Sequence, residues 1–380
     1  MLGAGIVGCA TAFELTRRGV SVCLIERGRE VSCGSTGLGE GNVLCSDKAP
    51  GPELDLAQRG LAAYDEIEEL LGAEAGIRRK GALVVHADPP GWEAEPGRVA
   101  RLQAAGVEGG LLAVEDVRAA EPELRGEILG GSWFPNDLQC APRAIARGLA
   151  READRLGATL LTGVDAQAVA VSRSGRVEGV DVVGGAEPVA ADRVVIAAGA
   201  WSAALAAGAG LELPLEPRKG QLVRLERRPG FVRHKLIEGA YMATVASPAA
   251  RLQVSTVIET TLDGHVLVGS SRERRGFDTA VDPALSERLV ERAARLVPGL
   301  AALRLESAWA GLRPWLPGGL PAIGPSDAAA GLWVATGHEG AGVAHGPVTG
   351  RLIAQAICGE PPDLDLAPFD PDRFAGLRPG

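Results

Sequence analysis

The feature that most constrains this chain is a glycine-rich turn at its start, in the segment MLGAGIVG. Gly3, Gly5 and Gly8 have the spacing GxGxxG, and the segment IVGCATAFELTRR continues with apolar residues at helical spacing. The next segment, VSVCLIE, is short and apolar like a buried parallel strand, and it ends at Glu26. This order of turn, helix, strand and acidic residue indicates most of a βαβ unit, and therefore an α/β fold.

Each part of this turn has a physical role in binding a dinucleotide. The first glycine permits the tight turn, the second lets the backbone approach a pyrophosphate, and the third lets the helix pack closely on the sheet. The helix N-terminus offers N–H groups and partial positive charge to the phosphates. A carboxylate such as Glu26 accepts hydrogen bonds from a ribose, which favours FAD or NAD over NADP. The glycine pattern alone is weak evidence in a chain with 52 glycines, so the neighbouring elements carry this prediction.

Only Met1 and Leu2 precede the turn, whereas such a turn normally follows a longer buried strand. Without more apolar residues, the central strand of a parallel sheet would lose most of its ladder and core contacts. We therefore expect either that the natural start lies a few codons upstream, or that the domain is weakened where it holds the pyrophosphate.

The predicted secondary structure changes along the middle of the chain. Long helices are predicted over 51–72, 141–157 and 283–300. Residues 88–110 are rich in proline, glycine and polar residues, which predicts an exposed connection. Between about 216 and 275, short semi-alternating strands indicate an antiparallel sheet. We therefore predict a discontinuous cofactor domain over 1–80, 140–215 and 305–380, and a substrate domain over 81–139 and 216–304.

Composition and charge limit the partners and the cellular location that we expect for the protein. A net charge of -9 argues against nucleic acid or an anionic membrane as the main partner. Six scattered cysteines without a CxxC pair predict a reduced, cytoplasmic protein without a zinc site or disulfides, with the inner face of the membrane as a further possible location. The apolar stretch from Val194 is long enough to raise the question of a membrane span. Its glycines and Pro214 favour a buried strand followed by a short helix.

A second glycine turn occurs near the end of the chain, in the segment ATGHEGAGVAHGPVTG. Gly337, Gly340 and Gly342 let the backbone approach a flat or charged group, and Pro347 suits the first turn of the helix that follows. The N-terminus of that helix can hold negative charge on the N1/C2=O edge of a reduced flavin. An NAD enzyme has no need of this second turn, so it favours FAD; a generic βα turn is the alternative.

Several segments occur together in one order: GAGIVG and LIERG, GSTGLGEGN, VVIAAGAWS, AGLRPWLPGGLPAIGP and GHEGAGV. With these segments, spread over nearly the whole chain, it resembles the FAD-dependent amine and D-amino-acid oxidase superfamily. That group holds glycine oxidase, sarcosine oxidase, hydrogen cyanide synthase subunits and D-hydroxyproline dehydrogenases. The segments VLVGSSRERRGFD and GHEGAG are most similar to the hydroxyproline dehydrogenase branch. The resemblance implies a Rossmann-like FAD-binding domain with an interleaved antiparallel-sheet substrate domain.

The resemblance also implies which residues bind the cofactor. The ADP half would contact Gly3, Gly5, Gly8, Glu26 and Arg27, with Ser35 and Thr36 by the pyrophosphate and the backbone of Ala166 at the adenine. The flavin would lie along Gly41, Asn42 and Val43, and its pyrimidine edge would be surrounded by His338, Gly340, Gly342 and Val343. Ala198, Gly199 and Trp201 would form a further cofactor turn, and Arg313 is assigned to the cofactor site as well as to the substrate.

The substrate residues implied by the resemblance are fewer. Arg313 in GLRPW matches an arginine that clamps a substrate carboxylate in glycine-oxidase-like members; a structural salt bridge is the alternative. Tyr241, on a predicted β segment, is either a substrate-facing hydroxyl or a half-buried packing residue. We expect Arg272 on the surface or at a domain hinge, and His345 and His86 in structural or surface positions.

The attachment of the flavin is predicted from a departure from the family pattern. In sarcosine oxidases a cysteine near the C-terminal Arg-Pro motif tethers the flavin, and RPWLP here contains none. Cys9, Cys33 and Cys45 lie near the cofactor segments in sequence, but none is positioned to replace it. The resemblance therefore implies non-covalent FAD.

The implied reaction oxidises the C–N bond of a small amino acid or secondary amine to an imine, by hydride transfer to flavin N5. Candidate substrates are D-amino acids, hydroxyproline-type acids, glycine and sarcosine. Oxygen, a quinone or an electron-transfer partner would be the acceptor, and a homo- or hetero-oligomer is compatible with the sequence. Three alternatives stay open: an FAD-dependent 2-hydroxy-acid dehydrogenase with His338 as its base, an FAD-binding subunit of a larger dehydrogenase, and a non-enzymatic nucleotide-binding protein.

Overall fold

The computed structural model describes residues 1–183, 188–242 and 252–376. One half of the molecule is built on a mostly parallel sheet that includes the first residues of the chain. In spatial order its strands are β7 (Thr159–Thr162), β1 (Cys23–Glu26), a short segment at Leu2, β11 (Val194–Ile196), β18 (Leu332–Thr336) and the antiparallel β17 (Ala322–Pro325). The predicted βαβ unit is therefore present.

The short segment before the glycine turn fills the centre of this sheet. Leu2 bridges Ile25 on one side and Ile196 on the other, and its side chain is only 1% exposed. Its N–H donates to Val195 O at 2.9 Å and its C=O accepts from Ala197 N at 2.8 Å. The expected loss of most ladder and core contacts is therefore wrong at Leu2.

Helices cover one face of this sheet, and a small antiparallel sheet covers the other. The helices are α1 (Ile6–Thr16), α3 (Pro52–Leu71), α6 (Pro142–Arg155) and α10 (Gly342–Cys358). On the opposite face lie α7 (Ser202–Gly208) and the strands β8 (Ala166–Val171), β9 (Val177–Val182) and β10 (Val189–Ala190). Gly350 lets α10 cross close to α1, because a Cβ there would lie 2.6 Å from backbone atoms of Ala10 and Thr11.

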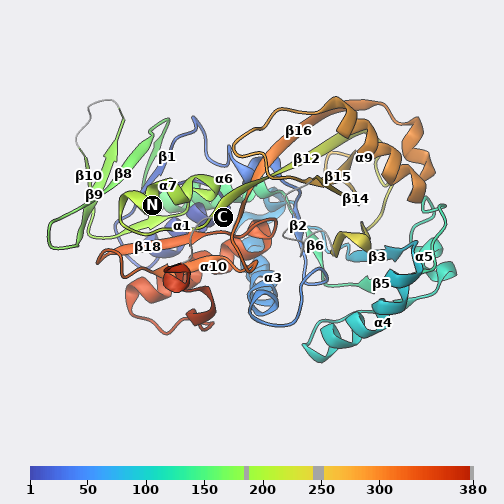
Figure 1. Ribbon diagram of the computed structural model, residues 1–380, viewed down its shortest axis with the longest axis horizontal. Coiled ribbons are helices and arrows are strands. Elements are labelled where there is room, and N and C mark those ends of the chain that lie inside the picture. The colour runs from blue at the N-terminus through green and yellow to red at the C-terminus, as the bar shows by residue number, and fades with distance from the viewer. Residues whose placement is uncertain (184–187, 243–251, 377–380) are drawn as a thin grey trace.

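The other half of the molecule is an eight-stranded sheet (Figure 1, right). Its order is β16 (Leu305–Trp315), β12 (Glu216–Arg227), β15 (His265–Arg272), β14 (Gln253–Thr260), β13 (Lys235–Glu238), β3 (Ala82–His86), β5 (Gly130–Phe134) and β4 (Gly110–Leu112). All neighbours pair antiparallel except β13 and β3. The helix α9 (Pro283–Leu296) packs its buried leucines on β14, β15 and β12. The predicted α/β fold with an antiparallel second sheet is confirmed.

Short elements join the two halves. They are α2 (Ser35–Leu38) and β2 (Asn42–Val43), which pairs with β6 (Leu138–Gln139). The helix α5 (Val114–Ala120) instead packs on β4 and β5 at the far end of the eight-stranded sheet. The stretch from Val194 is a buried strand followed by the short helix α7, as predicted. Within the described part of the chain, no helix is both long enough and apolar enough to cross a membrane.

The structure of residues 88–110 differs from the prediction. Residues 88–110 are not simply an exposed connection, since α4 (Pro89–Ala104) occupies most of them. Pro89 and Pro90 lie in the first helical turn, where the missing N–H costs nothing, and the Asp88 side chain caps this turn. A third proline, Pro96, lies inside the helix. The predicted domain bounds stay a prediction; β16, which begins at the predicted bound of 305, pairs with β12 of the eight-stranded sheet.

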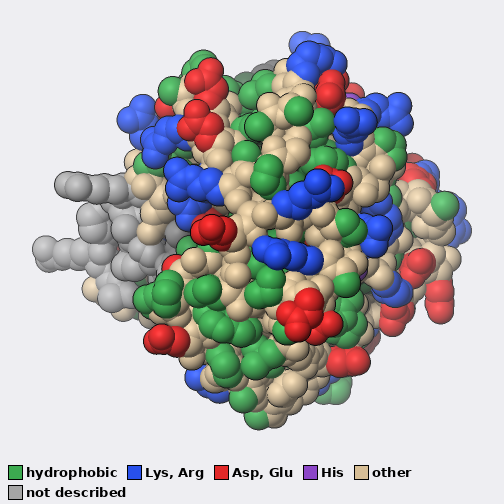
Figure 2. Space-filling model, turned by 90° about the vertical axis from the view of Figure 1, so that its right-hand side faces the viewer, with side chains coloured by type: hydrophobic (Ala, Val, Ile, Leu, Met, Phe, Trp, Pro, Cys, Tyr) green, Lys and Arg blue, Asp and Glu red, His purple; other side chains and the backbone are tan. Residues whose placement is uncertain are grey.

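Figure 2 shows the face at the end of the molecule that carries α9, α5 and α4. On that face acidic and basic side chains are interspersed with hydrophobic ones, and no extended area of one charge is visible. The expectation that nucleic acid is not a partner stays a prediction.

Candidate active site

A cavity of about 530 Å³ connects the two halves of the molecule. Its walls include the start of α1 and the end of β1 from the parallel-sheet half, and Leu222, Val257 and Arg313 from the eight-stranded sheet. This volume lies within the range of small-molecule and cofactor sites.

Most of the predicted site residues line this cavity. They are Gly3, Gly5, Glu26, Arg27, Ser35, Thr36, Asn42, Ala166, Ala198, Gly199, Trp201, Tyr241, Arg313, His338, Gly340, Gly342 and Val343. Gly8, Gly41 and Val43 are not among the lining residues and lie behind the wall. The cofactor contacts of all these residues stay predictions.

The first glycine turn has the geometry that its residues require. Gly3 has a φ of +98°, and a Cβ there would lie 2.6 Å from Ala197 O. A Cβ on Gly8 would lie 1.9 Å from Gly3 O, so this glycine lets α1 pack against the turn. Gly5 is the N-cap of α1 and offers no side chain to cap it, so the first turn of the helix opens on the cavity.

The Glu26 carboxylate is fixed by the backbone around the turn. It accepts hydrogen bonds from Ala4 N and from Gly28 N, both at 2.7 Å, and keeps lone pairs for further donors. Beside it the Arg27 guanidinium stacks on the Trp201 ring, 4.6 Å from its centroid. Cys33 also lines this end of the cavity, whereas Cys9 and Cys45 are buried and do not.

The second glycine turn leads into α10, whose N-terminus also opens on the cavity through Gly342 and Val343. The prediction that Pro347 lies in the first turn of this helix is wrong, because it is the sixth residue of α10. It therefore leaves the C=O of Val343, four residues earlier, without its usual donor. The buried Tyr64 hydroxyl donates to that carbonyl at 2.7 Å and so permits the proline.

His338 lies between this turn and the cavity, 5% exposed. Its Nε2 is 3.0 Å from Thr349 Oγ1, and burial lowers the pKa of His338 to about 3. The imidazole is therefore neutral near pH 7 and is a poor proton acceptor. His345 and His86 are both buried, and His86 Nε2 lies 3.2 Å from Glu95 Oε2, so the structural interpretation of these two is correct.

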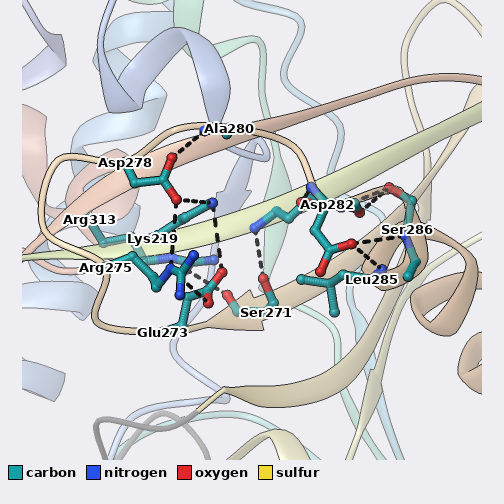
Figure 3. A network of polar contacts seen from close by, with 12 residues as sticks. Lys219, Ser271, Glu273, Arg275, Asp278, Ala280, Asp282, Leu285, Ser286 and Arg313 are labelled. Atoms are coloured by element: carbon teal, nitrogen blue, oxygen red, sulfur yellow. Dashed lines mark hydrogen bonds and ion pairs between the residues drawn. The ribbon is translucent and has the colours of Figure 1, made fainter.

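Arg313 is held on β16 at the eight-stranded end of the cavity. Its guanidinium crosses Gly220 of the neighbouring strand, where a Cβ would lie 1.9 Å from Arg313 Nη1. The same Nη1 donates to Ser271 O at 3.0 Å (Figure 3). Burial, and next the charge of Arg272, lower the pKa of Arg313, so an anionic ligand would offset this repulsion.

Lys219, a second cation near Arg313, forms ion pairs with Asp278 and Glu273 (Figure 3). It is 4% exposed, with Nζ 2.9 Å from Asp278 Oδ2 and 3.9 Å from Glu273 Oε1. Lys219 is not among the residues that line the cavity, whereas Arg313 is. Arg313 is therefore the better candidate for binding a ligand carboxylate.

The expectation for Arg272 is wrong. Its side chain is 2% exposed, and Nη2 donates to the Tyr241 hydroxyl at 3.0 Å while the guanidinium stacks on the tyrosine ring at 4.7 Å. Tyr241 is half-buried, lines the cavity and lies three residues after β13 rather than on a strand. Because Arg272 donates to the Tyr241 oxygen, the phenolic proton is left to point elsewhere.

Sequence reasoning missed three charged residues that line the cavity, namely Glu40, Asp165 and Glu339. Glu339, in the second glycine turn, lines the cavity beside Arg313 and is 12% exposed. Its Oε1 lies 3.5 Å from Arg272 Nε and 3.6 Å from Arg218 Nη1. The only available signal for Glu339 was a carboxylate in the glycine-rich segment GHEGAG. The pairing of β12 with β15, which brings Arg218 and Arg272 together, is not visible in the sequence.

Comparisons with known proteins agree with this geometry. The model of the FAD dependent oxidoreductase (DAO) family matches residues 2–356. A glycine oxidase from Pseudomonas aeruginosa is 31% identical over 401 aligned residues, which cover 98% of this chain and 97% of that protein. The crystal structure of glycine oxidase from Geobacillus kaustophilus has a TM-score of 0.88 at 27% identity, covering 99% of this chain and 98% of its own.

The structure of an iminodiacetate oxidase from a Chelativorans species has a TM-score of 0.82 at 28% identity, covering 97% of this chain and 98% of its own. These three relatives thus match over nearly their full length, and the resemblance seen in the sequence motifs is confirmed. This chain is an enzyme and belongs to the FAD-dependent oxidoreductase family of the D-amino-acid oxidase type.

Proposed function

We propose that this oxidoreductase oxidises the C–N bond of a small amine that carries a carboxylate, and forms an imine. The observation that carries the proposal is the cavity itself, which joins a dinucleotide-binding turn at one end to Arg313 at the other. Glycine, sarcosine, D-amino acids and hydroxyproline-type acids all have a carboxylate next to the C–N bond. The names of the relatives, glycine oxidase and iminodiacetate oxidase, support this class.

The residues present fit a bound FAD. Gly5 leaves the N-terminus of α1 uncapped toward the cavity, and Glu26 keeps acceptor sites for ribose hydroxyls. Of the described cysteines only Cys33 lines the cavity, and it lies beside Glu26, so we propose non-covalent FAD. When bound, FAD supplies a hydride acceptor at its N5 atom.

The protein then has to orient the substrate. The planar Arg313 guanidinium suits a carboxylate through two parallel N–H donors, which fixes the position of the neighbouring carbon. The Tyr241 hydroxyl, held by Arg272, lies at the same end of the cavity. Amine oxidation by hydride transfer needs little acid–base chemistry once the amine is neutral, so a strong base is not required.

The 2-hydroxy-acid alternative needs a base for the hydroxyl proton, and His338 was its candidate. With a pKa lowered to about 3 by burial, this imidazole does not suit that role. The structure thus favours the amine over the hydroxy acid.

The test is anaerobic reduction of the bound flavin, measured as loss of its absorbance. The compounds tested are glycine, sarcosine, D-proline-type acids and matching 2-hydroxy acids. We expect the amines to bleach the flavin. Bleaching by hydroxy acids alone would reject the proposal. The variant Arg313→Ala should raise the apparent dissociation constant for the amine about tenfold or more, because a charged hydrogen-bond pair is lost.

A further inference from the structure

The Glu339 carboxylate occupies an unusual place in the cavity. Its residue has a φ of +47°, a left-handed conformation that is uncommon outside glycine. Its N–H donates to Pro314 O at 2.9 Å, which ties the second glycine turn to β16 directly beside Arg313. The backbone therefore fixes this carboxylate next to the proposed carboxylate clamp.

The two oxygens of Glu339 differ in their partners. Oε2 accepts from Gly340 N, whereas Oε1 accepts no hydrogen bond from any residue in the described part of the chain. The guanidinium groups of Arg272 and Arg218 attract Oε1 from 3.5 and 3.6 Å, outside good hydrogen-bond geometry. A buried carboxylate oxygen that lines a cavity without a donor is a site for a ligand donor.

The charges around Glu339 keep it ionised. Burial acts to raise the pKa of Glu339, but the charges of the three arginines around it outweigh burial and hold the pKa below its usual value. The carboxylate therefore accepts hydrogen bonds and does not donate them near pH 7. Arg313 and Glu339 present opposite charges side by side in one cavity.

We infer that Glu339 is the specificity residue that receives the amine of the substrate, with Oε1 accepting an N–H while Arg313 holds the carboxylate. This inference rests on the proposed function and deepens it. The pair recognises both ends of an amino acid, and it orients the amine nitrogen relative to the carbon that loses the hydride. A carboxylic acid without an amine leaves Glu339 unmatched and brings a second negative charge close to it.

The experiment measures binding without turnover, on holoenzyme whose flavin has first been reduced with dithionite. Glycine and sarcosine are titrated calorimetrically against acetate, which has the same carboxylate but no amine. In Glu339→Gln, glycine and sarcosine should bind about 10- to 100-fold more weakly, the factor expected for a hydrogen bond to a charged group. Acetate should bind as tightly as to the wild type or more tightly, because a negative neighbour is removed.

Two further variants make the result specific. Glu339→Asp keeps the charge and should recover part of the preference for glycine over acetate, which a purely structural role would not produce. Glu273→Gln removes a carboxylate that lies beside Lys219 outside the cavity lining, and should leave all three affinities unchanged.

The inference is overturned if Glu339→Gln weakens acetate and glycine by the same factor, or if it changes neither. It is also overturned if the wild type binds glycine no better than acetate. These outcomes are distinct from failure of the proposed function, which is read from bleaching of the oxidised flavin, because binding to reduced enzyme needs no oxidation of the ligand.

Discussion

The substitution Gly8→Ala tests the glycine turn most sharply, because Gly8 acts from outside the cavity. The added Cβ would lie 1.9 Å from Gly3 O and 3.6 Å from the Ala197 side chain, and real Cβ atoms essentially never come within 3.0 Å of such a neighbour. The contact is with backbone, so α1 has to move away from the turn by about 1 Å or more. Overpacking of this kind costs about 1–3 kcal/mol.

We therefore expect two results for Gly8→Ala. The melting temperature of the cofactor-free protein falls by a few degrees, and the affinity for FAD falls about tenfold or more, because the helix N-terminus is displaced from the pyrophosphate. Quenching of FAD fluorescence on titration with cofactor-free protein gives the affinity. Gly208→Ala is the matched control in α7, where a new Cβ meets nothing within 4 Å, and both quantities should be unchanged or slightly improved. Unchanged FAD affinity in Gly8→Ala would refute the reasoning.

Two other predictions concern buried polar groups, both read from melting temperatures. Tyr64→Phe leaves the Val343 carbonyl without its donor and should cost about 1–3 kcal/mol; adding Pro347→Ala restores a backbone N–H and should recover part of the loss, whereas an additive loss would contradict this account. Burial raises the pKa of Asp137 to about 7, above its unfolded value, so the free energy of unfolding should fall as pH rises from about 4 to 7, by at most about 4 kcal/mol. Asp137→Asn should therefore stabilise the protein more at pH 8 than at pH 4.5, and an equal effect at both values would count against it.

The sequence was most informative where one residue type has a single physical use. Gly3 and Gly8 occupy positions that no side chain can enter, so their spacing predicted a real turn in spite of the short strand before it. The long helices and the switch to an antiparallel sheet followed from periodicity in the same way. Local patterns of this kind are decided within a few residues of chain.

The sequence was less informative where tertiary contacts decide the outcome. Pro347 is tolerated inside α10 because the Tyr64 hydroxyl, far away in sequence, donates to the Val343 carbonyl that the proline leaves without an N–H donor. The arginine-rich segment around Arg272 predicts a surface position, but in the structure this side chain is buried against Tyr241. The environment of Glu339 is set by Arg218 and Arg272, which come from two other strands. No local sequence pattern predicts that these residues lie together.

The most direct measurement of the central claim is the anaerobic titration of flavin absorbance in the wild type and in Arg313→Ala. The account predicts that small amino carboxylates bleach the wild-type flavin, and that the variant needs about tenfold or more of the same compound. Bleaching by 2-hydroxy acids alone, or an unchanged apparent affinity in Arg313→Ala, would contradict it.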